Sequence, residues 1–586
     1  MSIPLSYNVQ IEFDIPATMR DGTILRANIF RPVASGPFPV LLTRLPYGKD
    51  LPLGNSVINA YEAARRGYIV VVQDVRGRFA SEGEWHAFLA ERPDGYDSVE
   101  WAAQLPGSDG TVGMFGASYF GFTQLAAARE RPPHLRALAP FITWARTEDG
   151  PVFRGGALEL GLGRHWSQIN ALDTSLRRTR PTGDPRQIIG GIMRLAAELD
   201  ALPERGYADL PVKGFSTRRD DDALNDIDAA IDQRADASYL DIASAANSYD
   251  ALAQYPALHI GGWYDIFLNG TLQNYTELTA RGQAPQKLLI GPWSHTAQDE
   301  RVGSVAFGFG ASAGLINLQT DLHSLQLRWF DRFLKADPNG IDTEAPVQIF
   351  VMGINQWRAE NAWPLARAVP TPWYLHSGGA ANGVAGDGTL SPEAPGTEPN
   401  DTYAYDPMNP VPTVGGAFLM HPLFQNGPQD QRPIERRSDV LVFTSAPLTA
   451  DTEVTGPITV TLFAATDAPD TDFVARLVDV HPNGFARNLT DGIIRGRFRN
   501  GFAQEQLLTP GEITQFTLDL WATSNVFRAG HRIRLDITSS NFPRWDRNLN
   551  TDAPYGEGTE SAVATQTIVH DRTHPSHVVL PIVPQS

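Results

Sequence analysis

The sequence predicts an α/β protein that carries a helical insertion and ends in a β domain. Three observations support this fold class. Short apolar runs alternate with helical segments in residues 1–146 and again in residues 253–365. Residues 147–252 contain helical segments without a convincing strand, and residues 366–586 alternate apolar and polar side chains. A chain of 586 residues is also longer than one core usually supports, so several domains are expected.

The composition excludes several classes of function. A formal net charge of -18 disfavours the phosphate-neutralising surface that nucleic-acid binding requires. The chain has no cysteine, which rules out disulfides, thiolate metal sites and cysteine nucleophiles. No window has the length and apolar character of a membrane span, and the N-terminus lacks the features of a signal peptide. We therefore expect no membrane association and a cytoplasmic location, although a mature secreted form would have the same features.

The first part of the chain predicts a sheet with parallel strands. Residues 11–31 have the pattern of an antiparallel hairpin that turns at an Asp-Gly pair. Residues 40–43 and 68–73 are apolar runs typical of strands buried on both faces, and a helical segment lies between them. Strand, helix and strand in this order imply a right-handed crossover between parallel strands. The same alternation continues with helix 95–105, strand 112–115, helix 122–129 and strand 135–142.

The insertion and the region after it are distinguished by their periodicity. Helical patterns at 187–199 and 221–234 fall in the insertion, and apolar runs at 257–261 and 287–291 mark the return of the α/β pattern. The next helix is predicted from an apolar stripe formed by Leu318, Leu322, Leu325, Trp329 and Phe333. The later period-two segments predict a β-sandwich or jelly roll, entered through the Gly-, Ala- and Pro-rich residues 378–400.

The stretch around Ser118 has the pattern of a nucleophile elbow. Gly116 and Gly121 flank the serine between the predicted strand and helix, an arrangement that presents a hydroxyl at a helix N-terminus. Phe120 occupies the position at which the G-x-S-x-G pattern has its second glycine. On this pattern alone, a glycine-flanked turn is as good an interpretation as a nucleophile.

A serine nucleophile needs a histidine base and a carboxylate that orients the histidine. In an α/β-hydrolase these follow the serine in the order acid, then histidine. Asp265 follows the apolar run at 257–261, and His295 follows the run at 287–291. Because the carboxyl ends of parallel strands share one edge, we expect Ser118, Asp265 and His295 to meet there. His259, inside the first run, is expected to pack within the sheet.

Acyl transfer also requires hydrogen-bond donors for the developing oxyanion. The backbone N–H of Tyr119, directly after the serine, is one candidate because of the geometry of the elbow. The second is expected from the loop after residues 40–43, where Tyr47 could donate through its phenol. From the residues alone, an aromatic ring packed on Pro46 at a turn is the simpler interpretation of Tyr47.

Six ordered motifs give the chain a family resemblance. They are Arg44–Tyr47, Gln73–Gly83, Asp94–Trp101, Gly116–Gly121, Gly262–Asp265 and Gly291–His295. Together they resemble the cocaine-esterase-like (CocE/NonD) serine hydrolases of the X-prolyl dipeptidyl-peptidase group. The resemblance covers nearly the whole chain, is weakest in the helical insertion, and includes the glycine spacing of the elbow.

The resemblance implies an α/β-hydrolase core, an inserted helical cap and a C-terminal jelly-roll β domain, with the site between them. It implies that Ser118, Asp265 and His295 form the catalytic triad, and that Tyr47 joins the Tyr119 N–H in the oxyanion hole. The implied substrate-binding residues are Phe267, Trp166, Leu423 and Phe424, of which the last two are equally well interpreted as core packing. The charged residues Asp74, Arg76 and Arg78 are expected to form buried ion pairs beside the sheet.

The predicted function is hydrolysis of a small-molecule carboxylic ester through an acyl-enzyme, with no metal or organic cofactor. The family also suggests a homodimer. Amide hydrolysis stays open as an alternative, by an X-Pro dipeptidyl-peptidase, a β-lactam acylase or α-amino ester hydrolase, or an aryl amidase. A substrate with a free α-ammonium would need nearby acids, such as those at Asp220 to Asp222. A noncatalytic ligand-binding protein is the more distant alternative.

Overall fold

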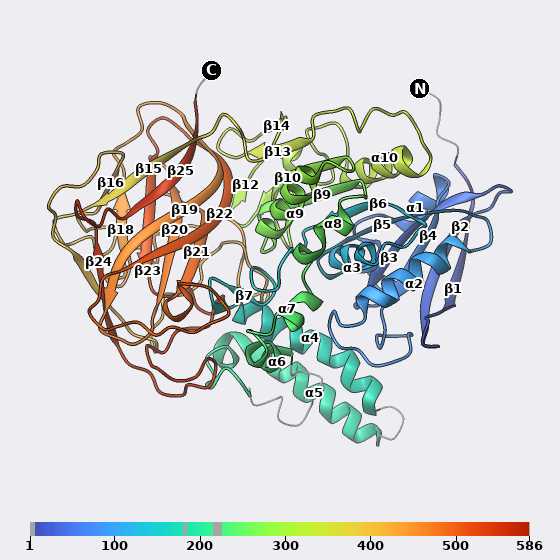
Figure 1. Ribbon diagram of the computed structural model, residues 1–586, viewed down its shortest axis with the longest axis horizontal. Coiled ribbons are helices and arrows are strands. Elements are labelled where there is room, and N and C mark those ends of the chain that lie inside the picture. Colours follow the sequence, from blue (N-terminus) through green and yellow to red (C-terminus); the bar gives the residue numbers. More distant parts are fainter. Residues whose placement is uncertain (1–5, 180–183, 215–225, 585–586) are drawn as a thin grey trace.

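The computed structural model describes residues 6–179, 184–214 and 226–584, and its elements form three regions (Figure 1). A sheet with helices on both faces lies at one end, a β domain lies at the other, and a group of helices lies below their junction. Among the described residues, no helix combines the length and apolar character that a membrane span requires.

The first sheet has ten strands in the order β1-β2-β4-β3-β5-β6-β9-β10-β13-β14. The strands from β4 to β13 in this order are parallel, and β1, β2 and β14 are antiparallel at the edges. The strands are β1 (Val9–Thr18), β2 (Ile24–Pro32), β3 (Phe38–Leu45), β4 (Ile69–Asp74), β5 (Ser108–Ala117), β6 (Leu135–Phe141), β9 (Ala257–Tyr264), β10 (Gln286–Ser294), β13 (Val347–Val351) and β14 (Gln356–Glu360).

Helices cover both faces of this sheet, which explains why its strands are apolar on both sides. Leu41 of β3 packs toward the face that carries α1 and α10, whereas Val40 and Leu42 pack toward the other face, because successive side chains of a strand alternate. The helices are α1 (Ala60–Arg65), α2 (Glu91–Ala103), α3 (Ser118–Arg129), α8 (Tyr249–Leu252), α9 (Leu268–Arg281) and α10 (Leu322–Leu334). The α/β fold class and the predicted order of strands and helices are confirmed.

The predicted start of the last of these helices is wrong. The stripe from Leu318 to Phe333 places Leu318 on the apolar face, but α10 begins at Leu322 because the Asp321 side chain caps it, accepting a hydrogen bond from the Ser324 N–H at 2.7 Å. Leu318 lies before this cap, with a φ of 57° and 67% of its surface exposed. Its spacing matches the helical period only by coincidence.

The cap is inserted between β6 and β9 and is mainly helical. Its described elements are β7 (Phe153–Arg154), β8 (Ala157–Leu158), α4 (Leu160–Thr179), α5 (Pro185–Ala201), α6 (Asp226–Asp232) and α7 (Ala237–Ile242). The predicted helix 187–199 lies within α5. The predicted helix 221–234 lies partly outside the described residues, and its described part contains α6. The hairpin of β7 and β8, with two-residue strands, is too short to produce a periodic signal in the sequence.

The chain leaves and re-enters the sheet at neighbouring strands. β6 and β9 are parallel partners, with Phe141 opposite Ile260, and the Ile142 N–H donates to the Ile260 carbonyl at 2.7 Å. The chain therefore leaves β6 at the edge where the parallel strands end, and it re-enters the sheet at the opposite edge, at the start of the neighbouring strand β9.

The second large sheet forms the jelly-roll β domain. Its strands follow the order β17-β24-β19-β25-β15-β16-β18-β23-β20-β21, and β22 pairs with β19. Alternate residues of β19, such as Ile458, Val460 and Leu462, are buried in its core, as predicted. The strands are β15 (Val369–His376), β16 (Thr389–Ser391), β17 (Asp401–Tyr405), β18 (Leu441–Thr444), β19 (Thr452–Thr466), β20 (Asp472–Val480), β21 (Ala486–Arg495), β22 (Thr514–Phe527), β23 (Arg532–Thr538), β24 (Ala564–Val569) and β25 (His577–Val583).

Candidate active site

The elbow at Ser118 is a strained turn that only its two glycines permit. Ala117 ends β5 and Ser118 begins α3 with a φ of 55°, which is unfavourable for a residue other than glycine. A Cβ at Gly116 would lie 2.4 Å from the Phe120 carbonyl oxygen, and one at Gly121 would lie 2.9 Å from Thr143 Cβ. The second glycine is therefore needed at Gly121, where the helix passes close to β6, and Phe120 is free to carry a side chain.

The side chains of Ser118, His295 and Asp265 form one chain of hydrogen bonds. His295 Nε2 lies 3.1 Å from Ser118 Oγ, and His295 Nδ1 lies 2.6 Å from Asp265 Oδ1. Each residue directly follows the end of its strand, β5, β10 or β9. These parallel strands all end at one edge of the sheet, so residues far apart in sequence meet there.

The carboxylate of Asp265 is held in one orientation. It is fully buried, and its second oxygen accepts the Phe267 backbone N–H at 3.0 Å. The Phe267 ring packs against the His295 ring at 5.2 Å and at right angles to it. An imidazole with its Nδ1 proton on a fixed carboxylate presents Nε2 as a hydrogen-bond acceptor, which is the arrangement that activates a serine hydroxyl.

Two groups beside Ser118 have the character of oxyanion donors. The Tyr119 backbone N–H lies in the first turn of α3, where backbone donors have no partner within the helix. The Tyr119 ring is anchored by its hydroxyl, which donates to Glu91 Oε1 at 2.9 Å and accepts the Phe88 N–H at 3.0 Å. Burial raises the pKa of Tyr119 well above its usual range, so this hydroxyl keeps its proton.

The second donor group is the phenol of Tyr47, two residues after the end of β3. Its oxygen accepts the indole N–H of Trp166 at 3.0 Å, and burial raises the pKa of Tyr47 to about 12. The phenol is therefore protonated near pH 7 and lines the same cavity as Ser118. The packing interpretation is also partly correct, because the ring of Tyr47 lies against Tyr119 and Phe120, each at 6.3 Å.

A cavity of about 880 Å³ opens beside Ser118 and His295. This volume lies in the range of small-molecule binding sites. Its walls come from the core, from α4, α6 and α7 of the cap and, through Leu419, from the β domain. The described lining includes the aromatic side chains Tyr47, Phe88, Tyr119, Phe120, Phe141, Trp144, Trp166, Tyr239 and Phe267.

Few charges face this cavity. Glu159 is the one carboxyl group in the described lining, and it is buried against the β domain, where its Oε1 accepts the Trp545 indole N–H at 2.8 Å and its Oε2 lies 3.8 Å from Arg544 Nε. Burial raises the pKa of Glu159. Burial, together with the neighbouring His421, lowers the pKa of His165 to about 4, so that its imidazole is neutral near pH 7. The cavity is suited to an uncharged, largely apolar ligand.

The structure does not bring every predicted pocket residue to the cavity. Trp166 and Phe267 line it, but Leu423 and Phe424 do not. Leu423 points to solvent, with 74% of its surface exposed, and Phe424 packs on Tyr207 of the cap at 6.0 Å. The β domain instead contributes Leu419, four residues earlier. The acids at Asp220 to Asp222 lie outside the described residues.

Apart from Trp166, the sequence did not reveal the part of the cap wall that α4 forms. Leu162, His165 and Ile169 also line the cavity, and they share one face of the helix with Trp166. Their spacing of three and four residues is the one signal that could have identified them.

Asp74, Arg76 and Arg78 were predicted to form a buried ion-pair lattice, but in the structure each has different partners. Arg76 pairs with the buried Asp94 at 2.6 Å and with the half-exposed Asp21 at 2.7 Å. Arg78 instead donates to the Pro46 carbonyl at 2.8 Å and to the Asn170 carbonyl of α4 at 2.9 Å, so it links the Tyr47 loop to the cap. Asp74 accepts the Lys49 backbone N–H at 2.7 Å.

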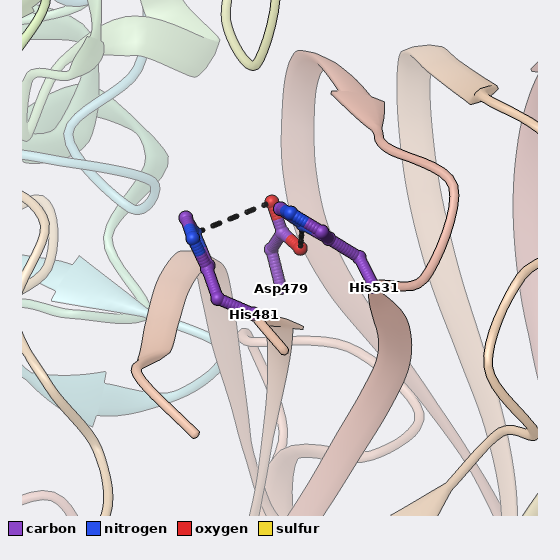
Figure 2. Close-up of side chains that lie close together, drawn as sticks. All are labelled: Asp479, His481 and His531. Atoms are coloured by element: carbon purple, nitrogen blue, oxygen red, sulfur yellow. Dashed lines mark hydrogen bonds and ion pairs between the residues drawn. The ribbon is translucent and has the colours of Figure 1, made fainter. Parts of the chain in front are cut away.

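Away from this cavity, Asp479, His481 and His531 bring metal-ligating groups together in the β domain (Figure 2). The carboxylate of Asp479 already has close partners, with Arg487 Nη2 at 2.8 Å and His531 Nδ1 at 2.7 Å. A guanidinium in contact with the carboxylate neutralises it and repels a divalent cation. We therefore interpret this cluster as the centre of a buried ion-pair network.

Comparison with known proteins gives matches along nearly the whole chain. The family described as "X-Pro dipeptidyl-peptidase (S15 family)" matches residues 21–297, and the "X-Pro dipeptidyl-peptidase C-terminal non-catalytic domain" matches residues 339–579. A cocaine esterase from Rhodococcus sp. (strain MB1 Bresler) is 39% identical over 585 residues, which cover 98% of this chain and 99% of that protein.

Two solved structures have the same overall fold. An α-amino acid ester hydrolase superposes with a TM-score of 0.80 at 23% identity, covering 99% of this chain and 98% of that chain. An aminopeptidase from the marine sediment archaeon Thaumarchaeota archaeon superposes with a TM-score of 0.78 at 24% identity, covering 100% and 97%. At this level of identity the likeness concerns the fold alone.

Proposed function

Because the chain belongs to the cocaine-esterase-like hydrolases of the X-Pro dipeptidyl-peptidase (S15) family, and is a carboxylic ester hydrolase, we propose that Ser118 is its nucleophile, His295 its base and Asp265 its orienting acid. The observation that carries the proposal is the chain of hydrogen bonds from Ser118 Oγ through His295 to Asp265, at 3.1 and 2.6 Å. It lies at the wall of an apolar cavity that is large enough for a small-molecule ester.

In the proposed acylation, Ser118 Oγ attacks the acyl carbon while His295 Nε2 takes the hydroxyl proton. The carbonyl oxygen becomes an oxyanion, which accepts hydrogen bonds from the Tyr119 N–H and the Tyr47 hydroxyl. The ester C–O bond then breaks, and His295 gives its proton to the departing alcohol. Asp265 keeps the imidazole in the required tautomer and stabilises the imidazolium.

In the proposed deacylation, a water molecule replaces the alcohol. His295 removes a proton from the water as its oxygen attacks the acyl carbon, and the same two donors stabilise the second oxyanion. The bond to Ser118 Oγ breaks, the serine regains a proton from His295, and the carboxylic acid leaves. One ester and one water thus yield one alcohol and one acid, and the enzyme returns to its starting state.

The lining of the cavity supports an ester whose acyl group is bulky and uncharged. Phe267, Trp144 and Trp166 offer apolar surface beside Ser118. Substrates with a free α-ammonium, such as dipeptides, find one carboxyl group in the described lining, Glu159, which is already engaged by Trp545 and Arg544. We therefore favour esters over the amide substrates of related peptidases.

The test compares Ser118→Ala with the wild-type enzyme on p-nitrophenyl esters with acetyl, butyryl and benzoyl groups, and on the matching anilides. Removal of the nucleophile is expected to lower kcat by about 10⁶-fold, and a serine-directed phosphonate should label Ser118 alone, as measured by peptide mass spectrometry. Substantial turnover by Ser118→Ala would contradict the nucleophile, and faster cleavage of anilides than of esters would contradict the substrate class.

The small-molecule ester is the partner that this activity requires. A cytoplasmic location and a homodimer stay predictions from the sequence. Light scattering combined with size-exclusion chromatography would test the homodimer directly.

A further inference from the structure

One hydrogen bond joins the cap to the proposed oxyanion hole. Trp166 belongs to α4 of the cap, and its indole N–H donates to the phenol oxygen of Tyr47 at 3.0 Å. The two residues are separated by 119 positions in the sequence, and Tyr47 follows strand β3 of the core. The bond is therefore a tertiary contact between two regions, rather than a local feature of a loop.

The direction of this bond determines what the phenol can do. An indole N–H can only donate, so Tyr47 Oη is the acceptor and its own proton stays available. Within the described part of the chain, no protein group accepts a hydrogen bond from that proton. The phenol lines the cavity beside Ser118, where the carbonyl oxygen of a bound ester would be held. A hydroxyl that accepts a hydrogen bond is also polarised into a stronger donor.

The indole of Trp166 is itself held in place by a stack of aromatic rings. It lies parallel to Phe88 at 6.1 Å and nearly parallel to Tyr119 at 6.3 Å, and it contacts Trp85 at 5.6 Å. Tyr119 supplies the other proposed donor through its backbone N–H. The Tyr47 phenol and the Tyr119 ring are therefore in contact with the same cap side chain.

We propose that Trp166 is a positioning residue for the oxyanion hole: its N–H fixes the Tyr47 hydroxyl so that the phenol proton points to the substrate carbonyl. This inference rests on the proposed function, because it requires that Tyr47 stabilises the oxyanion. It differs from the role of a pocket wall, in which Trp166 would contact the acyl group and change the affinity for substrate. A fixed donor contributes mainly in the transition state, so the effect belongs in kcat.

The experiment is a double-mutant cycle with Trp166→Phe and Tyr47→Phe. Phenylalanine keeps an aromatic ring in the stack but removes the N–H. In the enzyme with Tyr47 intact, Trp166→Phe is expected to lower kcat about three- to tenfold, the effect of losing one neutral hydrogen bond. In the Tyr47→Phe background, the same substitution is expected to change kcat less than twofold, because the hydroxyl that Trp166 holds is gone.

Trp144→Phe is the matched control. Trp144 also lines the cavity, but its indole N–H donates to the Ala243 carbonyl at 2.7 Å and does not contact Tyr47. Trp144→Phe should change kcat by the same factor in the enzyme with Tyr47 and in the Tyr47→Phe enzyme. Titration with the phosphonate measures the fraction of folded active sites in each variant. If Trp166→Phe does not fold, Trp166→Tyr, which also lacks the indole donor, takes its place.

The outcomes separate this inference from the proposed function. An equal loss of kcat in both Tyr47 backgrounds, a loss confined to KM, or no loss at all would each overturn the positioning role of Trp166. Tyr47→Phe alone is expected to lower kcat by about 10² to 10³. A Tyr47→Phe enzyme close to the wild type would instead remove Tyr47 from the proposed oxyanion hole, while leaving the nucleophile assignment to the Ser118→Ala test.

Discussion

The two walls of the cavity are built in different ways. On the core side, Ser118, Asp265 and His295 each follow a strand of one hydrogen-bonded sheet, whose register fixes where every strand ends. On the cap side, Leu162 and Ile169 lie on a helix outside this sheet, which is positioned by side-chain packing and by hydrogen bonds such as those from Arg78 and Trp166. The register of the sheet thus positions the catalytic side chains, whereas the position of the cap helix determines the shape of the ligand site.

One helix of the cap, α5, is also less firmly buried than the core. In α5, Leu195 is the one residue that is buried, and Ile189 and Met193 are 56% and 68% exposed. In β9 and β10, by contrast, almost every residue is buried. Changes in the triad should therefore affect all substrates alike, whereas changes in the cap wall, apart from Trp166, should discriminate between them.

Among the changes that test this difference between the walls, the largest effect is expected from Asp265→Asn on the core side. The asparagine amide can donate to His295 Nδ1, which leaves the proton on Nε2 and removes the acceptor that Ser118 needs. In serine proteases the corresponding change lowers kcat about 10⁴-fold, and we expect a similar loss here. Steady-state kinetics on acetyl, butyryl and benzoyl esters should show the same fold-loss of kcat for each ester. If the loss of kcat varies more than tenfold among these esters, the triad does not affect all substrates alike.

A second prediction concerns the stability of the core wall. His259 is buried in β9, as the sequence predicted, with Nε2 2.9 Å from Gln286 Oε1. Burial lowers the pKa of His259 to about 4 from its ordinary value of 6.5. Between these values the unfolded chain binds a proton that the folded chain does not, so this histidine makes the protein less stable as the pH falls from 6.5 to 4. The expected loss is on the order of 3 kcal/mol at pH 4.

His259→Gln should remove this contribution. Urea unfolding between pH 7 and 4.5 is expected to show a shallower decline in the free energy of unfolding, by up to about 1.4 kcal/mol per pH unit. His86→Gln, at a largely exposed side chain, is the matched control. An unchanged pH dependence for His259→Gln would show that the core admits water or a proton at this position.

The smallest expected effect comes from Leu162→Ala on the cap side. Leu162 packs with Trp144 and Phe267 at the cavity wall, so shortening it enlarges the space for the acyl group. We expect the ratio of kcat/KM for benzoyl over acetyl esters to rise about tenfold, the scale of a change in pocket size. An equal change in kcat/KM for both esters would contradict this prediction, because Leu162 would then affect the chemical step and not the choice of substrate.

The core wall of the cavity could be predicted from the sequence better than the cap wall. Asp265 and His295 could be assigned because each follows an apolar run, and the fold dictates that parallel strands end at one edge. Tyr47 could be placed at the edge, but its hydrogen bond to Trp166 could not, because no local pattern connects residues 119 positions apart.

The remaining errors have the same cause. Leu423 and Phe424 were predicted at the pocket, but the path of their loop over the cap is set by contacts such as that between Phe424 and Tyr207, and Leu419 reaches the cavity instead. Leu318 matched a helical period, yet the cap formed by Asp321 begins the helix after it. Periodicity identifies which elements exist, whereas their ends and distant partners depend on tertiary structure.

The seam between β6 and β9 has a consequence for how such enzymes diversify. The inserted segment starts and ends at adjacent, mutually bonded strands, so an insertion of another length or sequence can be exchanged there without shifting the register of the sheet. Substrate range can therefore evolve by recombination while the reaction is conserved. If the indole of Trp166 orients Tyr47, such an exchange has one constraint: the incoming segment must supply a hydrogen-bond donor at that position.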